Sequence, residues 1–218
     1  MVKPSDSPDL LVIGGGVIGL SIAWRASERG MSVTLLERDR LGQATSRVAA
    51  GMLAPVTEVE FGESGRRLLE LGLRSAELWP DFAERLQRTA GCEVGFLCTG
   101  TLLVARHEDE ARELERRLAL RRSLGLNAER LLPSAARERE PALAPTVRLA
   151  LEAPDDHSVD PRLTLRALRR ACEQAGVEIR EREAVRAVEL DGAGERVTGV
   201  VLGGGERVPA GQVVMAGH

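Results

Sequence analysis

The chain has 218 residues, of which 43% are hydrophobic and 29% are charged, and its formal net charge at pH 7 is −3. This length suffices for one large or two small domains with a substantial core, and the charge balance provides no electrostatic attraction to nucleic acid or acidic lipid. Aromatic residues make up only 2% of the chain and tyrosine is absent, so stacking platforms for single-stranded nucleic acid are excluded.

The first predicted elements are a strand, a glycine-rich turn and a helix. Gly14, Gly16 and Gly19 form G-x-G-x-x-G after the apolar run Leu10 to Ile13, and the helical pattern Val17 to Arg29 follows. In this context the triplet indicates dinucleotide binding. The first glycine permits a tight turn, the second lets the backbone approach a pyrophosphate, and the third lets the helix pack on the strand. The start of the helix offers N–H groups to phosphates.

The second predicted strand, Ser32 to Glu37, ends on an acidic residue. A carboxylate at this place accepts hydrogen bonds from both ribose hydroxyls and disfavours a cofactor with a 2′-phosphate. The alternative is a glycine-rich turn that binds nothing. That alternative is disfavoured because three consecutive glycines cost backbone entropy and return no packing.

The middle of the chain predicts mostly helices. Residues 42–55 lack a clean period and indicate an extended loop or a short helix start, and residues 63–89 have helical spacing, with Pro80 as a break between two helices. Residues 96–105 predict one or two strands, and residues 108–123 predict a charged helix. Interleaved acids make the arginines of that helix a solvated face rather than a nucleic-acid patch. A proline-interrupted stretch, residues 131–145, and a strand, residues 147–153, follow.

The last part predicts another helix–strand unit and an antiparallel meander. Asp160 as N-cap and Pro161 as the first helical residue begin a helix that Gly176 terminates. The expected strands after it cover residues 177–181, 184–190, 197–202, 206–209 and 212–216. The element order predicts an α/β fold with a parallel, Rossmann-like nucleotide-binding sheet and an antiparallel β-meander.

Metal binding and side-chain catalysis receive little support. Asp155, Asp156 and His157 precede Asp160, but turn and cap roles explain these acids, so no metal is expected. The cysteines show no metal-like pairing and indicate reduced thiols: Cys92, Cys98 and Cys172. The histidines have no acid or nucleophile partner by spacing and indicate structural or surface roles: His107, His157 and His218. The apolar stretch after Asp9 is too short for a membrane span and no signal peptide is evident, so we expect a soluble cytoplasmic protein.

Three motifs resemble the FAD-dependent D-amino-acid oxidase superfamily, and within it the glycine oxidases of thiamine biosynthesis (ThiO type). The motifs are DLLVIGGGVIGLSIAW with VTLLER, then ATSRVAAGMLAPVTEVEFGE, then HSVDPRLTLRALRRACEQAGVEI. The second motif is the most specific to glycine oxidases. The resemblance implies a Rossmann-like FAD-binding domain in two segments, 1–88 and 154–218. Residues 89–153 would form part of an α+β substrate domain.

The resemblance also implies the FAD contacts. The glycine loop would bind the pyrophosphate, Glu37 and Arg38 the adenosine, and the backbone of Val185 the adenine. The backbone at Ala50, Gly51 and Met52 would lie against the flavin ring, because small residues permit close approach. The hydroxyl groups of Thr45 and Ser46 would bind phosphate, although these residues could instead cap a helix. The implied cofactor-binding residues are Gly14, Gly16, Val17, Ile18, Gly19, Glu37, Arg38, Thr45, Ser46, Ala50, Gly51, Met52 and Val185.

The implied activity is oxidative deamination of glycine or a similar small amine, with dioxygen as acceptor and hydrogen peroxide as product, in the thiazole branch of thiamine biosynthesis. Two alternatives stay open: an amino-acid dehydrogenase with another electron acceptor, and a truncated, non-catalytic flavin-binding fragment. Members of the family continue beyond the Val-Val-x-Ala-Gly strand. The catalytic residues and the arginine for the substrate carboxylate are therefore unassigned. We expect the chain alone to bind FAD weakly or not at all, and to aggregate or to self-associate, with a homo-oligomer as one form, through exposed apolar faces.

Overall fold

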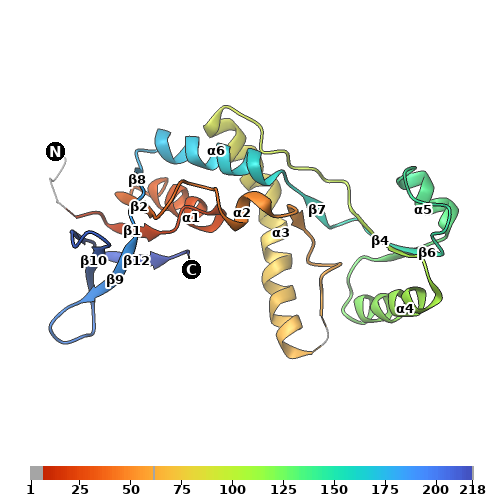
Figure 1. Ribbon diagram of the computed structural model, residues 1–218. Coiled ribbons are helices and arrows are strands. Elements are labelled where there is room, and N and C mark those ends of the chain that lie inside the picture. Colours follow the sequence, from red (N-terminus) through yellow and green to blue (C-terminus); the bar gives the residue numbers. More distant parts are fainter. Residues whose placement is uncertain (1–6, 61, 218) are drawn as a thin grey trace. The chain divides into compact units, whose positions relative to one another are not determined.

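The computed structural model describes residues 7–60 and 62–217, so His218 lies outside the described residues. The chain divides into two compact units (Figure 1). Unit 1 consists of Met1–Ala50, Glu84–Val94 and Asp160–His218, and unit 2 of Gly51–Ala83 and Gly95–Val159. The predicted functional segments 1–88, 89–153 and 154–218 divide the chain differently at residues 51–83, 89–94 and 154–159. Their assignment to FAD and substrate binding stays a prediction.

Unit 1 contains a four-stranded parallel sheet in the order β12-β1-β2-β8. Its strands are β1 (Leu10–Ile13), β2 (Val33–Glu37), β8 (Glu178–Glu181) and β12 (Gln212–Met215). The two central strands are apolar and buried along nearly their whole length, as expected for a parallel sheet that is covered on both faces. The predicted parallel sheet is therefore confirmed.

Two helices of unit 1 pack against each other beside this sheet (Figure 1). The first, α1 (Val17–Ser27), also packs on β1 and β2 and ends before Gly30, whose φ of +84° favours glycine. The second, α6 (Pro161–Gln174), begins at the predicted cap. The Asp160 carboxylate accepts hydrogen bonds from the N–H groups of Arg162 (2.8 Å) and Leu163 (3.0 Å).

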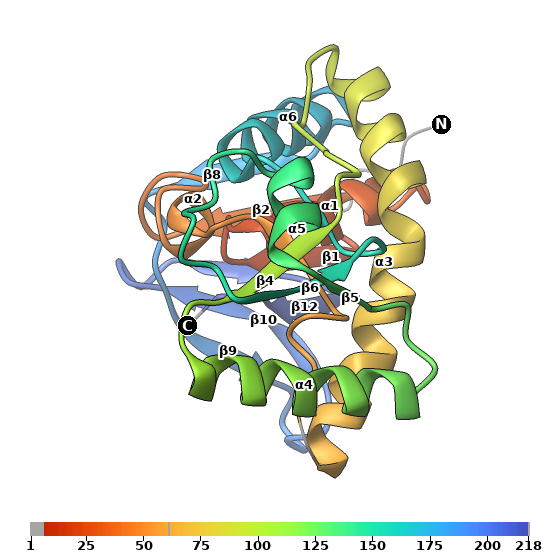
Figure 2. The same ribbon diagram turned by 90° about the vertical axis from the view of Figure 1, so that its right-hand side faces the viewer.

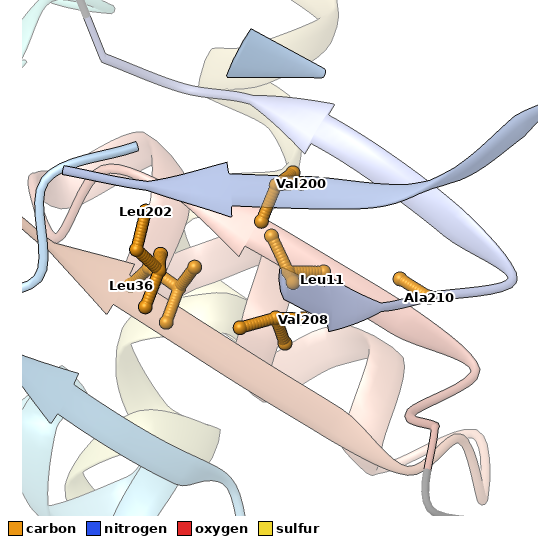
Figure 3. Packing of buried hydrophobic residues seen from close by; sticks show 6 residues of the cluster. All are labelled: Leu11, Leu36, Val200, Leu202, Val208 and Ala210. Carbon is orange, nitrogen blue, oxygen red and sulfur yellow. The ribbon is translucent and has the colours of Figure 1, made fainter. Parts of the chain in front are cut away.

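The opposite face of the parallel sheet is covered by the meander of β9 (Val185–Leu190), β10 (Val197–Leu202) and β11 (Arg207–Pro209). Leu11 and Leu36 of the sheet pack against meander side chains, as Figure 3 shows. The meander side chains in this cluster are Val200, Leu202, Val208 and Ala210. The predicted antiparallel meander is confirmed, and its apolar face explains why it stays on the sheet.

Unit 2 is built on an antiparallel sheet in the order β4-β6-β5. Its strands are β4 (Thr101–Ala105), β6 (Leu149–Ala153) and β5 (Glu129–Leu131). Two helices, α4 (Glu108–Ser123) and α5 (Pro133–Arg139), pack against this sheet from different sides (Figure 2). A short pair joins β3 (Met52–Leu53) to β7 (His157–Ser158).

Two local expectations need correction. Residues 63–90 form one helix, α3 (Glu63–Ala90), which continues through Pro80 instead of breaking there. Buried residues before and after the proline, such as Leu69 and Leu86, anchor both halves, and this packing outweighs the lost hydrogen bond. The stretch 131–145 contains α5, and β5 precedes it where no strand was expected. The short helix that was one expectation for residues 42–55 is present as α2 (Thr45–Val48), and β3 follows it. No helix in the described ranges has the length and apolarity that crossing a membrane requires.

Candidate cofactor site

The junction of β1 and α1 requires glycine at Gly14 and Gly19. Gly14 has φ of +108°, and its N–H donates to the Leu36 carbonyl at 2.8 Å. A Cβ atom on Gly14 would lie 2.8 Å from the Gly217 nitrogen, so the chain after β12 requires this glycine as much as the turn does. A Cβ on Gly19 would lie 1.9 Å from the Gly14 carbonyl oxygen. The predicted role of Gly19 in close helix–strand packing is thus confirmed.

The start of α1 faces a serine hydroxyl from α2. The Val17 N–H donates to Ser46 Oγ at 3.1 Å, and the first bond within the helix runs from the Leu20 N–H to the Gly16 carbonyl at 3.0 Å. Ser46 therefore binds the glycine-loop helix, and α2 has no side-chain cap of its own. A Cβ on Gly16 would approach Ser46 Oγ to 3.1 Å, so a side chain there would disturb this contact.

Glu37 binds the glycine loop directly. One carboxylate oxygen accepts from the Gly15 N–H at 2.7 Å, and the other accepts from the Asp39 N–H at 2.9 Å. These bonds fix a half-buried negative charge at the end of β2, beside the loop. Arg38 is exposed and lies 3.7 Å from Asp39 in an ion pair. The sequence located Glu37 but did not reveal its bond to Gly15, because this contact depends on the register of β1 and β2.

The remaining predicted positions are more scattered. Val185 begins β9 opposite Leu202 and packs against the core cluster, while Ile18, Thr45 and Ala50 are exposed. Within unit 1 the structure brings together the glycine loop, Glu37 and Ser46. Gly51 and Met52 belong to unit 2, where Gly51 has φ of +80° and its carbonyl accepts from the Val159 N–H at 2.8 Å. The Met52 side chain is 48% exposed.

Unit 2 also contains a cavity of about 830 Å³ that sequence reasoning missed. Its walls are residues 52–60 without Val56, one face of α3, and three side chains from β4 and α4: Leu103, Glu113 and Arg117. Two sequence signals lie nearby: the motif of residues 44–63, which supplies part of the cavity wall, and the cluster Asp155, Asp156 and His157. Within it, Asp156 is fully buried and accepts two backbone hydrogen bonds. The part of the chain that the structure describes holds no group of three potential metal ligands.

The geometry of unit 1 fits the ADP half of FAD. A dinucleotide site requires three parts, and unit 1 has all of them. They are a helix start with N–H groups, a loop without side chains where the pyrophosphate approaches the backbone, and a carboxylate at the end of β2. The hydroxyl of Ser46 adds a polar group at the same helix start. The residues that the structure brings together are therefore suited to this cofactor.

Comparison with known proteins identifies relatives. The glycine oxidase of Geobacillus kaustophilus (strain HTA426) is 33% identical over 187 residues, which cover 85% of this chain and 49% of the relative. The anaerobic glycerol-3-phosphate dehydrogenase subunit A1 of Haloferax volcanii is 37% identical over 155 residues, covering 71% and 24%. A crystal structure of glycine oxidase from Geobacillus kaustophilus superimposes with a TM-score of 0.86 at 31% identity, covering 97% of this chain and 55% of that one.

The chain thus spans about half the length of the glycine oxidases that it matches. The family model described as FAD dependent oxidoreductase (DAO) matches residues 9–218. This match includes the parallel sheet, the glycine loop and Glu37, and it confirms the resemblance at the level of the superfamily. The chain belongs to the DAO family of FAD-dependent oxidoreductases, and its cofactor is FAD.

Proposed function

We propose that this protein oxidises glycine or a similarly small amine and passes the electrons to dioxygen, which yields hydrogen peroxide. The observation that carries the proposal is the glycine loop, to which Glu37 binds at Gly15 and Ser46 binds at the start of α1. The small residues Ala50 and Gly51 follow in the chain. The similarity to glycine oxidases along most of the chain supports the choice of substrate.

In this proposal the described residues bind and orient the cofactor. The N–H groups at the start of α1 and the Ser46 hydroxyl bind the pyrophosphate, and Glu37 binds the ribose hydroxyls. Thr45 and Arg38 contribute at the rim of this site, and Val185 contributes its backbone to the adenine. When bound, FAD would accept the hydride of the substrate's Cα–H bond, and loss of an N–H proton would complete the imine. Gly51 and Met52 flank the ring.

We place this reaction in the thiazole branch of thiamine biosynthesis and in the cytoplasm. The support for the pathway is a relative named bifunctional protein ThiO/ThiG from Synechocystis sp., which is 34% identical over 186 residues. These residues cover 83% of this chain and 26% of that relative. The pathway and the location are tested by genetics rather than by the geometry of the site.

A dehydrogenase is the second candidate function. The observation in its favour is the Haloferax relative, whose name specifies a dehydrogenase subunit acting on glycerol 3-phosphate. A third interpretation is flavin binding without catalysis.

The test is to load the purified 218-residue protein with FAD and to supply glycine. We expect loss of the oxidised-flavin absorbance under anaerobic conditions and stoichiometric peroxide once air is admitted. Bleaching by glycine without peroxide would support the dehydrogenase. Bound flavin that no amine reduces would support flavin binding without catalysis.

A further inference from the structure

Two buried charged side chains in unit 2 hold the backbone of Val56 and Thr57, of which Thr57 lines the cavity. Arg121 of α4 and Asp156 of the turn before β7 are both fully buried, and the cofactor site uses neither. The Asp156 carboxylate accepts from the N–H groups of Val56 (2.9 Å) and Thr57 (2.7 Å). The Arg121 guanidinium donates to the carbonyl groups of Val56 (2.8 Å) and Thr57, and also to that of Arg117 (2.9 Å).

All four backbone polar groups of Val56 and Thr57 are therefore bound by two side chains. Burying an arginine and an aspartate is costly, and well-packed apolar residues often stabilise a fold as much or more. Desolvation lowers the pKa of Arg121, which reflects this cost. What the charged pair provides is a fixed backbone, because planar donors and a bidentate acceptor define the orientation of both peptide groups.

Thr57 is the residue that makes this fixed backbone relevant to a ligand. It lines the cavity of about 830 Å³, yet it is only 4% exposed. Its Oγ1 atom is buried and forms no hydrogen bond with the residues that the structure describes. A buried hydroxyl without a partner is unfavourable, so a ligand group that reaches Oγ1 from the cavity would supply the missing hydrogen bond.

We propose that Arg121 and Asp156 are positioning residues, which hold Val56 and Thr57 so that the Thr57 hydroxyl forms a hydrogen bond with the amino or carboxylate group of a small amino acid in this cavity. The inference rests on the proposed function, because it takes the amino acid to be the substrate. Thr57 is next to the segment that contains Met52, one of the predicted flavin contacts, and Met52 itself lines the same cavity.

The clamp is tested first without any turnover, by amide hydrogen exchange in the purified protein. In Asp156→Asn an amide group replaces one acceptor oxygen, so exchange at Val56 and Thr57 should accelerate at least tenfold. Asp160→Asn is the matched control, because Asp160 also accepts two backbone bonds, but at the start of α6. Unchanged exchange at Val56 and Thr57 in Asp156→Asn, or equal acceleration in the control, would overturn the clamp.

The contact of Thr57 with substrate is tested by Thr57→Val, which keeps the shape of the side chain and removes only the hydroxyl. We expect unchanged thermal stability, a KM for glycine about tenfold higher and a kcat within about twofold of the parent. Asp156→Asn should raise KM similarly, and Asp160→Asn should not. An unchanged KM in Thr57→Val would overturn the contact.

If the FAD-loaded protein produces no peroxide, the proposed function fails, and the inference is still decided by binding. Glycine is then titrated while the NMR signals of the Thr57 amide and methyl group are followed. Saturable shifts that weaken about tenfold in Thr57→Val support the contact. The absence of shifts in the parent protein contradicts it.

Discussion

The Glu37 carboxylate has a dual role that the sequence pattern did not show. Both of its oxygens accept backbone hydrogen bonds, from Gly15 (2.7 Å) and from Asp39 (2.9 Å). A group that already holds the glycine loop presents the remaining lone pairs of its oxygens to a ribose without further ordering. Binding of the ribose and the conformation of the loop are therefore coupled through one side chain.

We predict that Glu37→Gln weakens FAD binding about tenfold or more. The amide keeps one acceptor oxygen but turns a donor towards either the Gly15 or the Asp39 N–H, which costs about 1–3 kcal/mol for a charge-assisted bond. Fluorescence titration of FAD measures the loss. Asp39→Asn, a change of an exposed neighbour, is the control and should leave the affinity nearly unchanged. Equal affinity for the parent and Glu37→Gln would contradict the role of the carboxylate.

The three cysteines should differ sharply in reactivity. Burial raises the pKa of the Cys172 thiol to about 12, whereas Cys98 is exposed and Cys92 is half-buried. Since the thiolate is the reactive form, a thiol with its pKa raised to about 12 is almost entirely protonated, and therefore unreactive, at pH 8. With Ellman's reagent at pH 8 we expect Cys98 to react in the folded protein and Cys172 only after denaturation. Rapid modification of Cys172 under native conditions would contradict its burial.

At the scale of elements, the local sequence predicted element boundaries correctly where a residue type has one strongly preferred structural role. Asp160 followed by Pro161 predicted the start of α6, and the structure shows the cap. The glycine loop fixed the β1–α1 junction for the same reason. Of the candidate site, the sequence predicted the loop and Glu37. The Arg121–Asp156 clamp could not be predicted, since it joins residues that are distant in the sequence, and the cluster containing Asp156 indicated only turn and cap roles.

Pro80 shows why a local sequence pattern does not predict elements such as α3 and β5. A proline in a helical pattern usually marks a break, but α3 continues because buried residues on both sides keep it helical. Packing of that kind is set by partners far along the chain, which a local pattern does not contain. Short elements such as β5 are missed for a similar reason, since β5 exists only through pairing with β6.

We predict that Pro80→Ala stabilises the protein by about 2 kcal/mol. Alanine restores the missing N–H and removes the clash within the helix, worth about 3 kcal/mol, while the more flexible unfolded chain takes back up to about 1 kcal/mol. Urea denaturation followed by far-ultraviolet circular dichroism measures the change. Glu70→Ala, at an exposed position of α3, should change stability by less than about 0.5 kcal/mol. A lower midpoint for Pro80→Ala would mean that the proline shapes the packing of α3.

At the scale of the whole molecule, the two units have separate cores and separate candidate sites. Unit 1 contains the glycine loop, Glu37 and Ser46, and unit 2 contains the cavity with Thr57. A ligand that binds one folded unit stabilises that unit by mass action. The amides that become protected from hydrogen exchange therefore show which unit binds FAD. This holds even for a chain that spans about half the length of its relatives.

We predict that FAD at about one hundred times its Kd stabilises unit 1 by about 2.7 kcal/mol, which corresponds to a rise in Tm of roughly 5–10 °C for a protein of this size. Hydrogen exchange should slow at the amides of β1, α1 and β2 and change little in β4–β6. NADP⁺ should give a smaller rise at the same concentration, because its 2′-phosphate would meet the Glu37 carboxylate. Glu37→Gln should narrow the difference between the two cofactors, since the repulsion disappears with the charge. Equal stabilisation by both cofactors in the parent protein would contradict this assignment of Glu37, and protection centred on unit 2 would move the adenosine site away from the glycine loop.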